Sequence, residues 1–326
     1  MTPNQIYLPI DKLDTYREFS TDIEAQLQDF FDTPIGISAL DENETGNTLA
    51  IHAPYSLLHL EVAEEYTGED ANFSTGLNNE PLYHYEKEKP LYAPRTATVG
   101  DQFLRDYIKN KLGKVTTPKL EESIIKLVTE WESKHVQQGE YQPIPFYMEG
   151  QKLALDPLKF TLAYLLKIKE EVLQTKHTGE INLVFHPDIL FFLGNGKGNA
   201  VQKAARVLAK LSTQLGLNIV YENVVFKKES YKKALGWMEH PVAINELLER
   251  VGSTSGICID IQHLSKIGYP PGVVLYILRT LRDKGRKLLI HTRKNMGIEN
   301  DTWKKIVEEA YIYGIPIVYE PEMENA

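Results

Sequence analysis

The sequence predicts an α/β fold in which eight parallel strands and their connecting helices close into a (β/α)8, or TIM, barrel. Short apolar, β-branched runs alternate with longer amphipathic segments over most of the 326 residues, which is typical of a parallel sheet with crossover helices. Eight such runs can be counted, and eight strands close a barrel of this kind. Residues able to bind metal follow six of the runs, at the end where such barrels carry their active sites.

The predicted elements follow from apolar spacing along the chain. The eight strands are expected at residues 5–10, 35–40, 48–52, 181–185, 218–221, 256–259, 287–290 and 315–319. Helices are expected at residues 14–31, 153–173, 200–215, 242–251, 272–284 and 302–313, where apolar residues recur every three or four positions. The turn at residues 41–47 is an irregularity, because it is too short to hold a crossover helix.

One long segment, residues 64–150, interrupts this alternation and is rich in Tyr and Glu. Two helices are expected inside it, at residues 99–112 and 120–135. We therefore predict a barrel made of residues 1–63 and 151–326. The segment between them would be an insertion after the third strand that forms a lid or a small subdomain.

The composition is that of an ordinary globular protein, with 42% hydrophobic and 25% charged residues, which argues against a disordered or collagen-like chain. The 36 Lys and Arg against 45 Asp and Glu give a net charge of −9, so the surface as a whole should repel a polyanion. A nucleic-acid partner would therefore require a local basic surface or bound cations.

Several features predict a cytoplasmic or nucleoid-associated protein that is neither secreted nor in a membrane. No stretch approaches the roughly 18 consecutive apolar residues of a membrane span, and residues 1–5 lack the features of a signal peptide. The single cysteine, Cys258, allows no internal disulfide. It shares strand parity with Asp260, so its side chain is expected inside the barrel, one layer below the mouth.

Histidine and acidic residues stand at the carboxyl ends of predicted strands three to eight. They are His52, His186, Glu222, Asp260, His291 and Glu320. Because these ends meet at one face of a barrel, we expect the six side chains to converge. Imidazoles and carboxylates are ligands for Zn²⁺ or Mn²⁺, and a carboxylate can bridge two ions. The pattern therefore predicts a metal centre, since burying these groups without cations would be costly.

Motifs around these residues resemble those of the endonuclease IV family, which are abasic-site endonucleases on a xylose-isomerase-like barrel. The motifs are LAIHAPY at 49–55, VFHP at 184–187, YEN at 221–223, GICIDIQH at 256–263 and IP at 315–316 ahead of Glu320. The resemblance covers most of residues 1–60 and 180–326. It implies a metal-dependent phosphodiesterase that cleaves double-stranded DNA at abasic sites.

The resemblance also implies how the ligands are shared between two ions. His52, His186 and Glu222 would hold one ion, and Asp260, His291 and Glu320 the other. Glu222 would bridge the ions, and Glu222, Asp260 and Glu320 would be the catalytic carboxylates. A hydroxide shared by the two Zn²⁺ or Mn²⁺ ions would attack phosphorus.

A third ion is the point where the sequence departs from the family. His263 matches one of its ligands, but the Asp-x-His pair that completes the site is missing after His291. Either this third site is empty, or Glu299, Asp301 or the insertion supplies other ligands.

The same face is expected to carry the substrate-binding residues. Tyr55 matches the tyrosine that the family directs toward the DNA minor groove. Lys227 and Lys228 after the fifth strand, with Arg293 and Lys294 after the seventh, would provide the local basic surface.

Two other functions stay open. Glu222, Asp260, His291 and Glu320 also resemble the single-metal quartet of sugar isomerases and epimerases on the same barrel. A catalytically impaired descendant that binds DNA or protein is the other possibility, suggested by the missing Asp-x-His pair. The number of metal ions per chain would distinguish the nuclease, with two or three, from the isomerase, with one.

Overall fold

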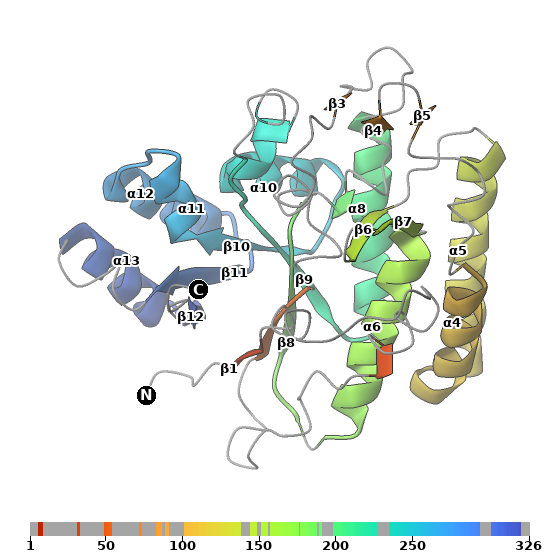
Figure 1. The fold of residues 1–326 in the computed structure, drawn as a ribbon. Coiled ribbons are helices and arrows are strands. Elements are labelled where there is room, and N and C mark those ends of the chain that lie inside the picture. The colour runs from red at the N-terminus through yellow and green to blue at the C-terminus, as the bar shows by residue number, and fades with distance from the viewer. Residues whose placement is uncertain are drawn as a thin grey trace.

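Seven strands of the chain form one parallel, barrel-like sheet (Figure 1). The structure is a computed structural model that describes residues 6–8, 31–32, 49–53, 72–73, 83–86, 89–90, 101–137, 144–148, 151–155, 157–175, 177–187, 189–190, 198–226, 232, 235–293 and 301–320. The strands, in their order across the sheet, are β1 (Ile6–Leu8), β2 (Leu49–His52), β8 (Ile181–Phe185), β9 (Asn218–Glu222), β10 (Gly256–Asp260), β11 (Leu288–Arg293) and β12 (Ile317–Glu320). Cα atoms of β1 and β12 approach within 8 Å, so the two ends of this order meet. The α/β barrel class predicted from the sequence is confirmed.

The sheet differs in detail from a row of eight consecutive strands. β1 pairs directly with β2, with Ile6 opposite Leu49. The strand predicted for residues 35–40 lies outside the described residues. β11 is longer than predicted, because it continues through Arg293.

The helices between the strands agree with the predicted pattern. They are α6 (Pro157–Leu173), α8 (Gly198–Gln214), α10 (Pro241–Arg250), α12 (Pro271–Asp283) and α13 (Asp301–Ile312). Of the helix predicted for residues 14–31, only residue 31 is described, as the start of a helical stretch at residues 31–32. Two short elements were not expected from apolar spacing, namely the 3₁₀ turn η4 (Gly236–Glu239) and α11 (Ile261–Lys266).

The predicted start of the helix at residue 153 is wrong. β6 (Ile144–Met148) pairs antiparallel with β7 (Gln151–Leu155), so residues 153–155 belong to a hairpin. α6 begins only at Pro157, since proline favours the first turn of a helix, where its missing N–H is not needed. The boundary proposed at residue 150 falls between the two strands of this hairpin.

The two helices predicted between residues 64 and 150 are confirmed as α4 (Asp101–Val115) and α5 (Pro118–Gln137). α4 packs against α6 and α5 against α8, so the pair lies outside the helices that cover the sheet (Figure 1). Lys111 of α4 forms an ion pair with Glu170 of α6. β3 (Asn72–Phe73), β4 (Tyr83–Glu86) and β5 (Lys89–Pro90) form a separate antiparallel sheet. That residues 64–150 act as a lid or subdomain stays a prediction.

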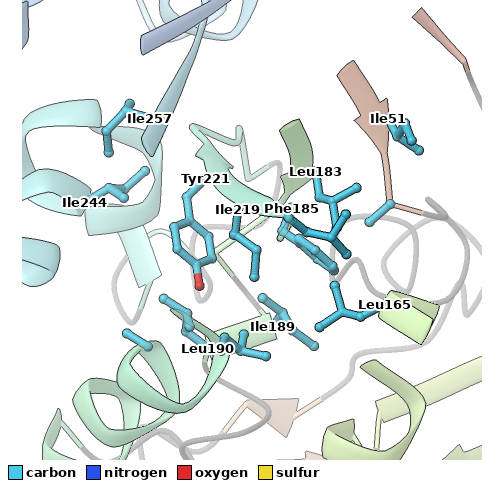
Figure 2. Packing of buried hydrophobic residues seen from close by; sticks show 14 of the residues in the cluster. Ile51, Leu165, Leu183, Phe185, Ile189, Leu190, Ile219, Tyr221, Ile244 and Ile257 are labelled. Carbon is cyan, nitrogen blue, oxygen red and sulfur yellow. The ribbon is translucent and has the colours of Figure 1, made fainter. Parts of the chain in front are cut away.

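The outer face of the barrel strands packs against the helices. Phe185 and Ile219 share one buried cluster with Leu165 of α6, and Ile257 lies near Ile244 of α10 in the same cluster (Figure 2). Burying a side chain of this size contributes roughly 1.5–3 kcal/mol relative to leaving it exposed. This core holds the strands in place around the barrel axis.

The inner face of six strands forms a second apolar cluster. Its members are Ala50, Val184, Val220, Cys258, Leu289 and Val318. Each stands two residues before one of the six predicted metal ligands, so strand alternation directs both to the same face. This confirms the predicted inward position of Cys258. The layer is tight, because a Cβ on Gly256 would lie 2.8 Å from Val220 Cγ1.

No helix in the described part of the chain has the length and apolar character needed to cross a membrane.

Candidate metal centre

Five of the six predicted ligands converge above the inner apolar cluster. His52, Glu222 and Asp260 are the last residues of β2, β9 and β10, His186 directly follows β8, and His291 lies within β11. All five side chains are buried: the exposed fraction of these residues runs from 7% for His52 to 0% for His291. These five residues therefore meet at one face of the barrel.

Glu222 is the centre of the arrangement. Its Oε2 lies 2.9 Å from His291 Nδ1 and 3.4 Å from His52 Nε2. Its Oε1 lies 3.7 Å from His263 Nδ1, on α11. One carboxylate therefore contacts histidines from both sides of the barrel mouth.

Three overlapping groups of side chains place their ligand atoms within 4.8 Å of one another. They are His52, His186 and Glu222; Glu222, Cys258 and His291; and Glu222, Asp260 and His263. Glu222 belongs to all three. Buried His, Glu, Asp and Cys side chains of this chain could therefore hold metal, with Glu222 as the shared ligand.

The residues fit a divalent cation on electrostatic grounds. Ligand oxygens of Glu222 and Asp260 lie within 4.8 Å of each other, and both residues are at most 2% exposed. Two carboxylate charges at that separation repel by at least roughly 3 kcal/mol at an effective dielectric constant of about 20. A cation between them would remove this cost.

The spacing of one ligand pair also suits zinc. Tetrahedral Zn²⁺ with bonds of about 2.0–2.1 Å separates neighbouring ligand atoms by roughly 3.3 Å. His52 Nε2 and Glu222 Oε2 are 3.4 Å apart. The pair needs little rearrangement to accept the ion.

His52 is oriented for binding through Nε2, because its Nδ1 donates to the carbonyl of Ala53 at 2.8 Å and its Nε2 faces Glu222. His263 differs, since its Nδ1 donates to the carbonyl of Asn223 at 2.7 Å and is also the nitrogen that faces Glu222 and Asp260. A carbonyl can only accept, so Nδ1 carries the proton and Nε2 the lone pair. Metal-binding histidines usually have such a partner on the other ring nitrogen.

Asn223 holds the Asp260 end of the centre in position. The backbone N–H of Asp260 donates to Asn223 Oδ1 at 2.9 Å, and Asn223 Nδ2 donates to the Asp260 carbonyl at 3.2 Å. The Asp260 side chain in turn accepts from the His263 N–H at 2.7 Å, which caps α11. Asn223 was noted in the sequence only as part of a motif. Its role depends on the register of β9 beside β10.

The protonation states suit a centre that exchanges a proton for a metal. Burial by itself raises the pKa of Glu222, but His291 and His52 outweigh burial and hold that pKa well below its usual range. Burial opposes the charged form of His291, yet the Glu222 carboxylate raises its pKa above the ordinary value. Burial lowers the pKa of His186 well below its usual range, so this imidazole is neutral and able to bind a metal.

Other predicted site residues are only partly described. Glu320 ends β12 opposite Arg293 of β11, but the side chains of both lie outside the described part. Arg293 was expected in the loop after the seventh strand. That prediction is wrong, because β11 continues past residue 290 and ends at Arg293. Tyr55, Lys227, Lys228, Lys294 and Glu299 lie outside the described residues, as does the side chain of Asp301.

Two further residues near the centre were not singled out as site residues in the sequence. Tyr164 of α6 donates its hydroxyl to the His52 carbonyl at 3.4 Å, and burial raises its pKa well above the ordinary value. Cys258 places its sulfur within reach of Glu222 and His291 while packing in the inner apolar cluster. Apolar spacing revealed the burial of Cys258 but not this proximity.

Comparison with known proteins gives a distant structural similarity. No protein-family model matches the chain, and no curated protein matches it. Among solved structures, the apo form of the 3-keto-D-glucoside 4-epimerase YcjR from E. coli is similar, with a TM-score of 0.34 and 15% sequence identity. The match covers 49% of this chain and 63% of the epimerase, so the chain spans less than two thirds of that protein. The function therefore has to be argued from the site.

Proposed function

We propose that this protein is a metal-dependent phosphodiester hydrolase of the abasic-site endonuclease type, acting on DNA. The observation that supports the proposal is the membership of Glu222 in all three candidate ligand groups. A carboxylate shared in this way suits at least two divalent ions, which is the arrangement used to stabilise both the attacking and the leaving oxygen in phosphoryl transfer.

The residues of the chain would have distinct parts in this reaction. Divalent cations bound there would supply positive charge to the phosphoryl oxygens and would acidify a water molecule. Glu222 and Asp260 would hold the cations, and Asn223 would keep His263 and Asp260 aligned through the contacts described above. His291 would release its proton when a cation is bound, since its pKa is raised mainly by Glu222.

Local positive charge would also be needed, because the chain has a net charge of −9. The predicted contributors are Lys227, Lys228, Arg293 and Lys294, together with the cations themselves. Their role in binding double-stranded DNA remains part of the proposal.

Metal analysis combined with DNA cleavage tests the proposal. Purified protein loaded with Zn²⁺ or Mn²⁺ should contain at least two ions per chain and nick a synthetic duplex at an abasic site. The Glu222→Gln variant, prepared in parallel, should do neither. Cleavage by that variant at the wild-type rate would refute the assignment.

A single-metal sugar isomerase or epimerase is the second candidate. It is favoured by the depth of the centre, since His291 is fully buried and Glu222 is 2% exposed, which suits a small substrate better than a polymer. The acidic net charge points the same way. One ion per chain, with no nicking and with conversion of an aldose or ketose, would favour this candidate. Duplex binding without turnover in either metal would instead indicate an impaired descendant.

A further inference from the structure

A pocket of about 480 Å³ is lined by residues that follow β9 and α11, and none of its described lining residues belongs to the three candidate ligand groups. Four groups that can bind an anion line it, namely Lys232, Lys266, His240 and Tyr269. Val225 and Glu239 also contribute to the lining. The pocket is therefore a polar cavity with two ammonium groups rather than a gap in the core.

The pocket is connected to the centre by two short segments of chain. Val225 lies three residues after Glu222, which limits the distance between their Cα atoms to roughly 11 Å. Lys266 ends α11, a helix capped by Asp260, and six residues of helix span about 9 Å. The pocket is thus on the order of 10 Å from the ligands at the ends of β9 and β10.

The remaining polar groups of the pocket leave it suited to an anion. Among the described residues of the lining, Glu239 is the one carboxylate, and its Oε1 accepts the backbone N–H of Phe226 at 2.9 Å. Tyr269 Oη and His240 Nδ1 are 2.7 Å apart. Whichever of them donates in this bond, the neutral pair keeps one further N–H or O–H donor. Two lysines and this donor outnumber the single carboxylate.

We propose that this pocket is a subsite for a phosphate group, which in the proposed reaction is a backbone phosphate flanking the scissile one. The inference rests on the proposed function. Phosphates of one DNA strand are spaced roughly 3.4 Å along the helix axis and also turn about it, which about doubles their direct separation, so a distance of about 10 Å corresponds to one or two nucleotides. Lys232 and Lys266 bind the phosphate oxygens, and the His240–Tyr269 pair donates the additional hydrogen bond.

The test uses the metal-loaded full chain and removes the two charges. Lys232→Gln, Lys266→Gln and the double variant are compared with wild type for binding of an abasic duplex over a range of salt concentrations. A phosphate contact contributes roughly 0.9 to the slope of log K against log salt, so the double variant, which loses this one contact, should lose about 0.9. Lys210→Gln is the matched control, because Lys210 is exposed on α8 and should leave the slope unchanged.

Two results separate the pocket from the nuclease assignment. An unchanged slope in the double variant, with wild-type metal content, overturns the inference. If the wild type binds no duplex, the proposed function fails. Calorimetric titration with inorganic phosphate then shows whether the pocket binds a phosphate group. Roughly five- to tenfold weaker phosphate binding by the double variant supports the subsite, whereas equal binding, or no binding by either protein, overturns it. Tyr269→Phe, which keeps both lysines, should weaken phosphate binding in the same assay.

Discussion

Replacing Glu222 with glutamine separates metal binding from folding more cleanly than any other change in the described residues. Glutamine has nearly the same shape but no charge. The variant loses the shared ligand of all three groups. We therefore expect a folded protein that no longer binds zinc.

The size of the effect on the metal-free protein follows from the neighbouring charges. Glu222 is attracted by the His291 imidazolium at 2.9 Å, by about 6 kcal/mol at an effective dielectric constant of 20. The Asp260 carboxylate repels it by at least roughly 3 kcal/mol, and keeping a charged carboxylate buried costs several kcal/mol more. These contributions largely cancel, so the free energy of unfolding of metal-free Glu222→Gln should lie within about 2 kcal/mol of that of the metal-free wild type.

The metal-bound proteins should differ much more. Zinc at about 100 times its dissociation constant stabilises a folded protein by roughly 2.7 kcal/mol. In a chain of this size that corresponds to a rise in Tm of about 5 °C.

Thermal unfolding with a chelator and with zinc, together with metal analysis, provides the measurement. The wild type should show the rise in Tm and Glu222→Gln should show less than about 1 °C. Glu170→Gln is a suitable control, because Glu170 is a half-buried carboxylate paired with Lys111 away from the centre and should retain the full shift. Bound zinc and an unaltered Tm shift in Glu222→Gln would refute the reasoning.

Three other predictions follow from the same centre. Asn223→Ala should lower zinc affinity roughly 10- to 100-fold in a chelator competition, because it frees the Asp260 backbone and the His263 ring; wild-type affinity would contradict this. Cys258→Ala should lower the free energy of unfolding in urea by about 1–2 kcal/mol through a small cavity in the inner cluster, with metal content unchanged; a lost ion would identify Cys258 as a ligand. The raised pKa of His291 means that zinc must displace a proton, so binding should weaken as the pH falls through that raised pKa, with proton release seen by calorimetry in two buffers. In the metal-free protein, the folding stability depends on pH with the opposite sign. The His291–Glu222 pair contributes its full stabilisation of the fold below about pH 6.5, and this contribution is lost as the pH rises through the raised pKa of His291.

The six ligand positions could be found in the sequence because they depend on local regularities. A parallel strand buried on both faces appears as a short apolar run, and its carboxyl end is marked by the first polar residue. Strand alternation then places Asp260 above Cys258 and His291 above Leu289, without knowledge of the sheet order. The helices α10, α12 and α13 were equally accessible, since each carries an apolar face at helical spacing.

Other features depend on pairings between residues far apart in the chain. That β1 lies beside β2, and that residues 151–155 form a hairpin instead of the start of α6, are consequences of strand partners that apolar spacing does not specify. The short helix α11 is set by the Asp260 cap rather than by periodicity.

The sequence by itself determined the fold class, the inner and outer faces of the strands, and the residue types gathered at the barrel mouth. Only the tertiary structure decided the distances by which Glu222 belongs to every candidate ligand group, the contacts by which Asn223 holds Asp260 and His263, and the polar pocket lined by Lys232 and Lys266. The physical reason is that alternation along a strand is a local property of the backbone. The distances between side chains on different strands are instead set by register and by the packing of the whole barrel.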